Sequence, residues 1–102
     1  MGSKEYCIMQ ISDKPGMEWS NKRFPGAHRH EVFGGPDRMH SIEDGLVIFL
    51  TPEMHNMTNA GIHYNKDFRE YAQDMAQRRW MEFYNKTEDD FRKRYRMSYL
   101  KE

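Results

Sequence analysis

Residues 46–55 carry the strongest secondary-structure signals of the chain, and they read Leu46-Val47-Ile48-Phe49-Leu50-Thr51-Pro52-Glu53-Met54-His55. The first five form the longest apolar run, which predicts a strand buried on both faces. Thr51-Pro52-Glu53 then predicts a helix start, because Thr accepts hydrogen bonds from free amides, Pro fits the first helical position and an acidic group suits the positive end of the helix dipole. We expect this helix to be short, with a left-handed stop at Asn59-Ala60-Gly61.

Upstream of this stretch, the sequence predicts a long loop and one further strand. Residues 12–27 are rich in Pro, Gly, Ser, Asn and charged side chains, a composition typical of loops. Residues 28–33 are compatible with a strand and are followed by a glycine pair, so we expect them to pair antiparallel with residues 46–50. The connection is expected to be a loop of about ten residues that contains Asp37, Arg38 and His40. We expect His40 to be exposed there and to have no functional role.

Two longer helices are expected in the C-terminal third, over about residues 65–84 and 87–100. In the first, apolar residues recur at three- and four-residue offsets, the spacing of a helix face that packs into a core. The second starts at Thr87, whose spacing to Asp90 fits a capping box. The predicted fold class is α+β, in a single domain over residues 1–102.

The composition lies near the lower limit for a folded domain. Sixteen of the 102 residues are Leu, Ile, Val or Phe, a share below the roughly 20% under which composition suggests disorder. The zero net charge and the 14% of aromatic residues argue the other way, since disorder needs low hydrophobicity with high net charge or few aromatics. We expect a small core of aromatic rings and thioethers that needs a metal or a partner to stabilise it.

Membrane-spanning, secreted and disulfide-stabilised proteins are not expected. The longest apolar run has five residues, far fewer than the roughly 18 of a membrane span, and the polar start of the chain is unlike a secretion signal. The single cysteine, Cys7, cannot form an internal disulfide, which fits a reducing compartment such as the cytoplasm. We expect the Cys7 thiol to be buried or inert. The sequence leaves the oligomeric state open.

Four of the five histidines and one asparagine fall where a strand, a second strand and a short helix would bring them together. They are His28 and His30 on the first strand, His55 and Asn59 on the short helix, and His63 just beyond it. Alternate residues of a strand point to one face, so the two strand histidines point together and Arg29 points away. A neutral imidazole can remove a proton from water, a divalent cation held by imidazoles stabilises a leaving oxygen, and arginines hold phosphates. This set therefore indicates metal-assisted hydrolysis of phosphodiesters.

At these residues the sequence resembles the HNH family, the His-Me finger endonucleases with a ββα-metal fold. The resemblance rests on Arg29-His30 at the first strand, on Leu50 to His55 at the strand-to-helix junction, and on Asn59 four residues further along. The segments RHEVFGG, SIEDGLVIFL, HNMTNAGIHYN and RYRMSYL are similar to a group of small HNH-like proteins of phages and prophages. The resemblance covers about residues 28–100 and implies a ββα unit at about 28–62, followed by two additional helices.

The departures from the family pattern lie at metal-binding positions. Thr51 and Met54 stand where zinc-binding members have cysteines, and Gln10 stands where a further cysteine is expected, so the resemblance implies no four-cysteine zinc site. Arg29 stands where a metal-ligating Asp or His is usual. Asp44-Gly45 replaces the Asn of the middle position.

The leading hypothesis is a metal-dependent DNA endonuclease or nickase of HNH type from a phage or prophage, acting in the host cytoplasm. His30 would activate the water, and Arg29 or His28 would contact the phosphate. The cofactor is a divalent cation, Mg²⁺, Mn²⁺, Ni²⁺ or Zn²⁺. Two sets of ligands stay open: His55 with His63 or Asn59, and a rearranged set of His28, His55 and His63.

Two alternatives stay open beside this hypothesis. On the same scaffold, a catalytically inactive binding protein would inhibit a host defence protein; the zero net charge favours this version, because DNA enzymes normally carry a basic face. A structural zinc module built from Cys7 and histidines is the third option. A basic cluster in the C-terminal third is predicted either to contact a nucleic-acid backbone or to form a solvated face: Arg92, Lys93, Arg94 and Arg96.

Overall fold

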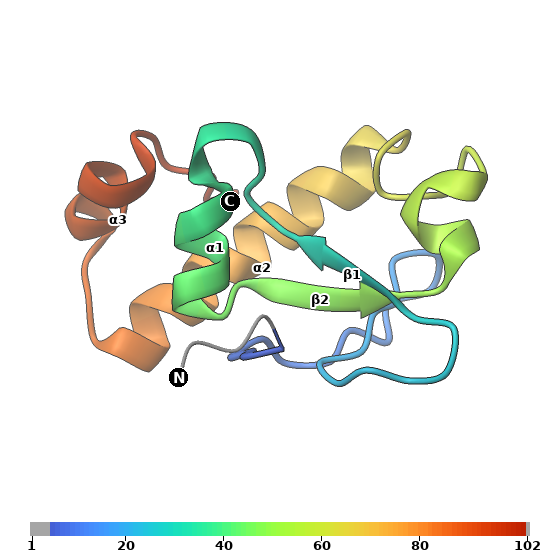
Figure 1. The fold of residues 1–102 in the computed structure, drawn as a ribbon. Helices are drawn as coiled ribbons and strands as arrows, with labels where there is room; N and C mark the ends of the chain where they lie inside the picture. The colour runs from blue at the N-terminus through green and yellow to red at the C-terminus, as the bar shows by residue number, and fades with distance from the viewer. Residues whose placement is uncertain (1–4, 102) are drawn as a thin grey trace.

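The computed structural model describes residues 5–101, and the expected strand pair is present in it. Strands β1 (His28–Glu31) and β2 (Val47–Leu50) run antiparallel, as the ribbon in Figure 1 shows. All residues of β2 are buried, as the apolar run predicts. The second edge of β2 is also covered, because Phe49 exchanges two backbone hydrogen bonds of 2.9 Å with Ser20.

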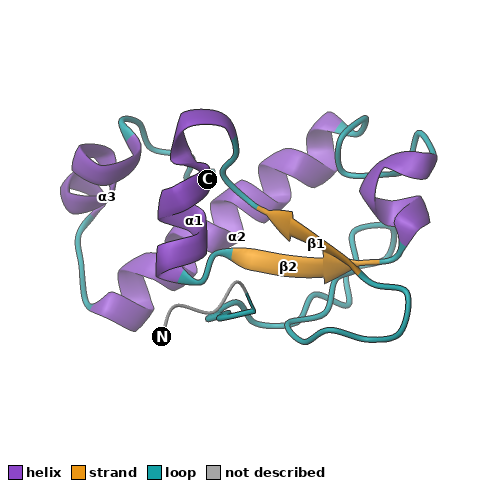
Figure 2. Cartoon of the chain, in the orientation of Figure 1, coloured by secondary structure: helices purple, strands orange, loops and turns teal. Residues whose placement is uncertain are grey.

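The connection between the strands is helical, and the prediction of an exposed loop is wrong. A single 3-10 turn, η1 (Gly35–Asp37), leads into helix α1 (Arg38–Asp44), as Figure 2 shows. The helix ends at Gly45, whose φ of 77° is the left-handed conformation that glycine adopts at helix ends. His40 therefore lies on a helix, half-buried, with its ring 5.6 Å from that of Tyr95.

After β2 the chain makes one π-helical turn, η2 (Glu53–Met57), where a short helix is predicted. Thr51 starts it as expected, because its hydroxyl accepts a hydrogen bond from the Met54 amide at 3.2 Å. The left-handed stop predicted at Gly61 is wrong, since the φ of Gly61 is not positive. Gly61 is needed for a different reason: a Cβ there would lie 2.9 Å from the carbonyl oxygen of His55.

The two C-terminal helices begin where the sequence predicts. Helix α2 (Lys66–Tyr84) follows its N-cap Asn65, and helix α3 (Glu88–Tyr95) follows Thr87, which forms the predicted capping box with Asp90. Helix α3 ends earlier than the predicted residue 100, because the residue after its last turn takes a left-handed conformation with a φ of 73°.

The core lies between the sheet and the helices, with α2 crossing behind the sheet in Figure 1. Its aromatic part has ring centroids 4.4–6.3 Å apart and consists of Phe33, Trp80, Phe91 and Tyr95. Aromatic rings thus supply much of the apolar volume, as the composition predicts. Within residues 5–101, none of the helices has both the length and the apolar character that crossing a membrane would require.

Candidate metal centre

Three histidines from separate segments meet beside the sheet. His30 comes from β1, His55 from η2 and His63 from the turn that follows, and each offers one ring nitrogen such that the three lie within 4.8 Å of one another. Two nitrogens that share a zinc-like cation at roughly 2.1 Å lie at most about 4.2 Å apart. The three nitrogens are therefore close to the spacing that a shared cation requires.

Strand pairing sets the position of His30. Directly paired residues of antiparallel strands have their side chains on the same face, and His30 is paired with Ile48 while His28 is paired with Leu50. Both histidines therefore lie on the face that carries these two core residues. Arg29 lies on the other face, as predicted, and its Nη2 is 2.7 Å from a carboxylate oxygen of Glu31.

The return of the chain over η2 sets the positions of the other two rings. The amide of Ile62 donates to the Met54 carbonyl at 2.7 Å, and the amide of His63 donates to the His55 carbonyl at 3.2 Å. The Nε2 atoms of His55 and His63 consequently lie 3.0 Å apart. The fold-back expected at His63 is confirmed, and it rests on a π-helical turn, a rare geometry that is frequent at functional sites.

The environment keeps two of these rings neutral at pH 7. Burial first, and then the neighbouring His63 and His55, lower the pKa of His30 to about 3. Burial, followed by His63 and His28, also lowers the pKa of His55, against a smaller opposing effect of Glu31. A neutral imidazole offers a lone pair, which is the form that binds a metal. The donor set therefore fits a divalent cation.

The three histidines line a pocket of about 420 Å³ together with two arginines, Arg29 and Arg69. Only 13% of the Arg29 side chain is exposed, and its buried Nη1 has no hydrogen-bond partner among the described residues. Arg69 donates to the carbonyl of His63 at 3.2 Å. No local pattern in the sequence distinguishes Arg69, because the first turn of α2 brings it to the site.

Three other predicted site residues lie outside the three-nitrogen cluster. The Nδ1 of His28 is 3.1 Å from the Nδ1 of His55. Asn59 is exposed in the turn after η2 and does not line the pocket. Cys7 donates its thiol hydrogen to the Val47 carbonyl at 3.0 Å, and burial raises the pKa of that thiol. The structure thus does not bring Cys7 to the histidines.

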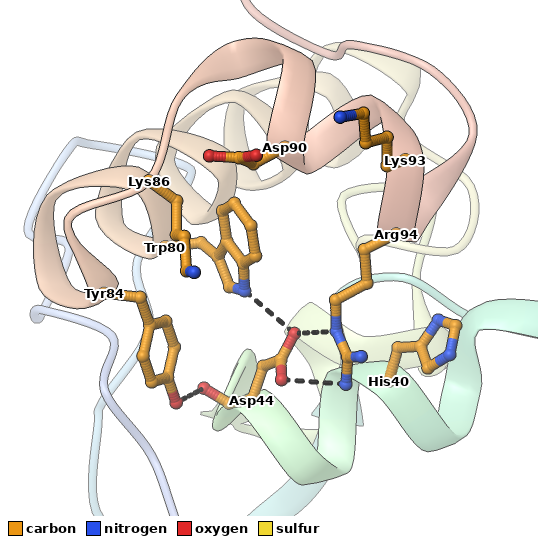
Figure 3. A pocket seen from close by; sticks show the side chains of 8 residues that line it. All are labelled: His40, Asp44, Trp80, Tyr84, Lys86, Asp90, Lys93 and Arg94. Atoms are coloured by element: carbon orange, nitrogen blue, oxygen red, sulfur yellow. Dashed lines mark hydrogen bonds and ion pairs between the residues drawn. The ribbon is translucent and has the colours of Figure 1, made fainter.

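Ion pairs within the chain occupy most of the predicted nucleic-acid-binding cluster. The pairs are 2.7–3.0 Å long and join Arg92 to Glu88, Arg94 to Asp44, and Arg96 to Asp37. Lys93 lines a separate pocket of about 660 Å³ between α1, α2 and α3, which Figure 3 shows. A DNA phosphate at this cluster would have to compete with three carboxylates of the protein itself.

Asp44, at the middle position of the resemblance, has a structural role in this pocket (Figure 3). Its buried carboxylate accepts hydrogen bonds from the Trp80 indole at 2.9 Å, from Arg94 at 2.7 Å and from the Tyr95 hydroxyl at 2.7 Å. The Tyr84 hydroxyl donates to its backbone carbonyl at 2.9 Å. Asp44 therefore links α1 to α2 and α3, and it does not line the histidine pocket.

The arrangement combines a place for one cation with neighbouring positive side chains. Three protein ligands leave a coordination position open, as catalytic zinc sites do, and arginines beside it suit a negatively charged ligand. No protein-family model, curated protein or solved structure matches this chain. What the centre does is therefore inferred from its own chemistry.

Proposed function

We propose that this protein is a divalent-metal-dependent DNA endonuclease or nickase of HNH type, carried by a phage or prophage. The observation that supports it best is the group of three imidazole nitrogens within 4.8 Å, in a pocket that also contains two arginines. His30, His55 and His63 would hold the cation. When bound, the cation would stabilise the negative charge that develops on the leaving oxygen.

His30 serves better as a metal ligand than as the base expected from the sequence. A nitrogen that donates its lone pair to a cation cannot also remove a proton from water. A pKa near 3 is also far below the value near neutrality that suits a general base. We therefore assign His30 to the ligand set.

We propose Glu31 as the group that accepts the proton of the attacking water. Among the described residues that line the pocket, it alone carries a carboxylate. Arg29 at 2.7 Å and Arg38 at 3.4 Å fix its position at the pocket wall. The local sequence does not identify this role, because Glu31 stands on the strand face opposite to His30.

Arg69 is the better placed of the two arginines for a backbone phosphate. Its Nη1 contacts the carbonyl of His63, and the rest of its guanidinium keeps donors for a ligand. Arg29 already pairs with Glu31, so a phosphate would have to compete for it. Contacts of this kind position DNA without reading its sequence.

Plasmid nicking tests this proposal. Wild-type protein should convert supercoiled plasmid to the open circle with at least one of Mg²⁺, Mn²⁺, Ni²⁺ or Zn²⁺, and EDTA should stop it. His30→Ala and His55→Ala should lose the activity, whereas His40→Ala, a half-buried histidine outside this pocket, should retain it. Equal nicking by His30→Ala and wild type would contradict the proposal.

A second candidate is an inactive binding protein on the same scaffold that inhibits a host defence protein. The zero net charge and the exposure of several large apolar side chains favour it: Ile11, Met39, Met57, Tyr64, Phe83 and Met97. Methionine-rich surfaces adapt to protein partners. Stoichiometric capture of a single host protein, with no cleavage in any of the four metals, would favour this candidate.

A further inference from the structure

We infer that His28 is a positioning residue, which accepts the Nδ1 hydrogen of His55 and thereby stabilises the metal-bound arrangement in which His55 offers Nε2 to the cation. The inference rests on the proposed metal centre. It adds a role for a histidine that the three-nitrogen cluster leaves out.

The two ring nitrogens of His55 have different neighbours. Its Nε2 lies 3.0 Å from the Nε2 of His63, and its Nδ1 lies 3.1 Å from the Nδ1 of His28. A neutral imidazole has one N–H and one lone pair. With the Nε2 lone pairs of His55 and His63 both directed at a shared cation, the hydrogen of His55 must be on Nδ1.

Within the part of the chain that the structure describes, His28 is the partner of that Nδ1 hydrogen. The two rings are perpendicular, with centroids 5.2 Å apart. For His28 to accept, its own Nδ1 must carry the lone pair and its hydrogen must be on Nε2. In the metal-bound protein the contact therefore runs from His55 to His28, whereas the metal-free pair can also form it in reverse.

Without the cation, a second arrangement competes. His55 can instead carry its hydrogen on Nε2 and donate it to His63, which is only 3.0 Å away. That arrangement removes from the site one of the lone pairs that a cation needs. His28 can support that arrangement too, by carrying its own hydrogen on Nδ1 and donating it to His55. The cation therefore selects the direction of the contact, and His28 then stabilises the metal-bound ring by accepting its hydrogen.

The backbone explains why one short strand can supply both functions. His28 and His30 are two residues apart on β1 and share a face. One of them is a ligand, and the other supports a ligand that comes from η2. Partners of this second kind typically change metal affinity by roughly 10- to 100-fold when they are removed.

Zinc titration of two variants at His28 tests the inference. His28→Leu keeps bulk and loses the acceptor, so its Zn²⁺ affinity should fall by roughly 10- to 100-fold. His28→Asn places an amide oxygen near the position of Nδ1 and should bind within a few-fold of wild type. His40→Leu is the matched control, and circular dichroism should confirm that each variant is folded.

Nitrogen-15 NMR of the zinc-loaded wild type reads the tautomers directly and does not depend on any variant. His55 should carry its hydrogen on Nδ1, and His28 should carry its hydrogen on Nε2. A His55 that is protonated on Nε2, or a His28→Leu variant with wild-type affinity, would overturn the inference while the metal centre stands. Equal losses in His28→Leu and His28→Asn would overturn the acceptor role. Wild-type protein that binds no Zn²⁺ would overturn the metal centre, and the inference with it.

Discussion

His30 has the two properties that a metal ligand needs, a partly buried position and a neutral ring. The sequence predicts that His28 and His30 share one face of a strand, and the strand register confirms it. Which of the two is a ligand depends on η2 and on the turn that carries His63. Those segments are far from β1 in the sequence, so no local pattern distinguishes the two histidines.

The low pKa of His30 predicts how the stability of the metal-free protein depends on pH. The folded ring stays neutral down to about pH 3, whereas in the unfolded chain it takes up a proton below about pH 6.5. The free energy of unfolding should therefore decrease as the pH falls from 7 to 5, by up to about 1.4 kcal/mol per pH unit from this group. Urea denaturation at pH 7, 6 and 5 measures this free energy of unfolding. His30→Gln, which cannot ionise, should show a shallower decrease; the same slope as wild type would show that another group is responsible.

Glu31→Gln separates proton transfer from metal binding. The amide cannot accept a proton from water. It keeps one oxygen acceptor, whereas the carboxylate offers Oε2 to Arg29 and Oε1 to Arg38. Nicking should slow by roughly 100-fold or more, the usual contribution of a general base, while Zn²⁺ affinity stays close to that of wild type. Single-turnover nicking and zinc titration of the same preparation measure both effects. An unchanged nicking rate would exclude Glu31 as the base.

At the scale of elements, the strands and the starts of α2 and α3 follow from local signals, whereas α1 does not. The capping residues Asn65 and Thr87 are visible in the sequence, and the structure uses both. Helix α1 depends on contacts outside itself. Its Ser41 hydroxyl accepts from the Phe33 amide at 3.0 Å and donates to the Phe33 carbonyl at 2.8 Å. A pattern within residues 38–44 cannot contain that information.

The turn that brings His63 to His55 depends on Gly61. In Gly61→Ala, the new Cβ would lie 2.9 Å from the His55 carbonyl oxygen and 3.0 Å from that of Glu53, so the return segment must move away from η2. We expect a loss of about 1–3 kcal/mol in stability and weaker Zn²⁺ binding.

Gly34→Ala provides the matched control, because a Cβ there meets nothing within 4 Å. Thermal denaturation and zinc titration should show that Gly61→Ala has a clearly lower melting temperature and a clearly lower Zn²⁺ affinity than Gly34→Ala. A Gly61→Ala protein that behaves like Gly34→Ala would show that the close approach does not position His63.

At the scale of the whole molecule, a thin aliphatic core is supplemented by aromatic packing and by the buried carboxylate of Asp44. Asp44 connects α1 to Trp80, Arg94 and Tyr95. The sequence predicts the aromatic core from composition. It does not predict the role of Asp44, because the three donors are 36 to 51 residues away along the chain.

Asp44→Asn should therefore destabilise the whole fold and spare the metal site. The amide keeps the shape of the carboxylate but removes the buried charge opposite Arg94, which still pairs with Glu43. Breaking a buried ion pair costs about 3–5 kcal/mol. The partial exposure of Arg94 and its remaining pair with Glu43 reduce this to about 2 kcal/mol. Asp89→Asn, at a side chain that is 83% exposed, should cost less than about 0.5 kcal/mol. Chemical denaturation compares the stability of Asp44→Asn with that of Asp89→Asn. Equal midpoints would contradict the structural role of Asp44.

Isothermal titration with Zn²⁺ is the most direct test of the three-histidine centre. Wild-type protein and His40→Ala should each bind one ion per chain with the same affinity, and His30→Ala should lose this binding while it remains folded by circular dichroism. Wild-type protein that binds no ion, or His30→Ala that binds one ion with wild-type affinity, would contradict the metal centre.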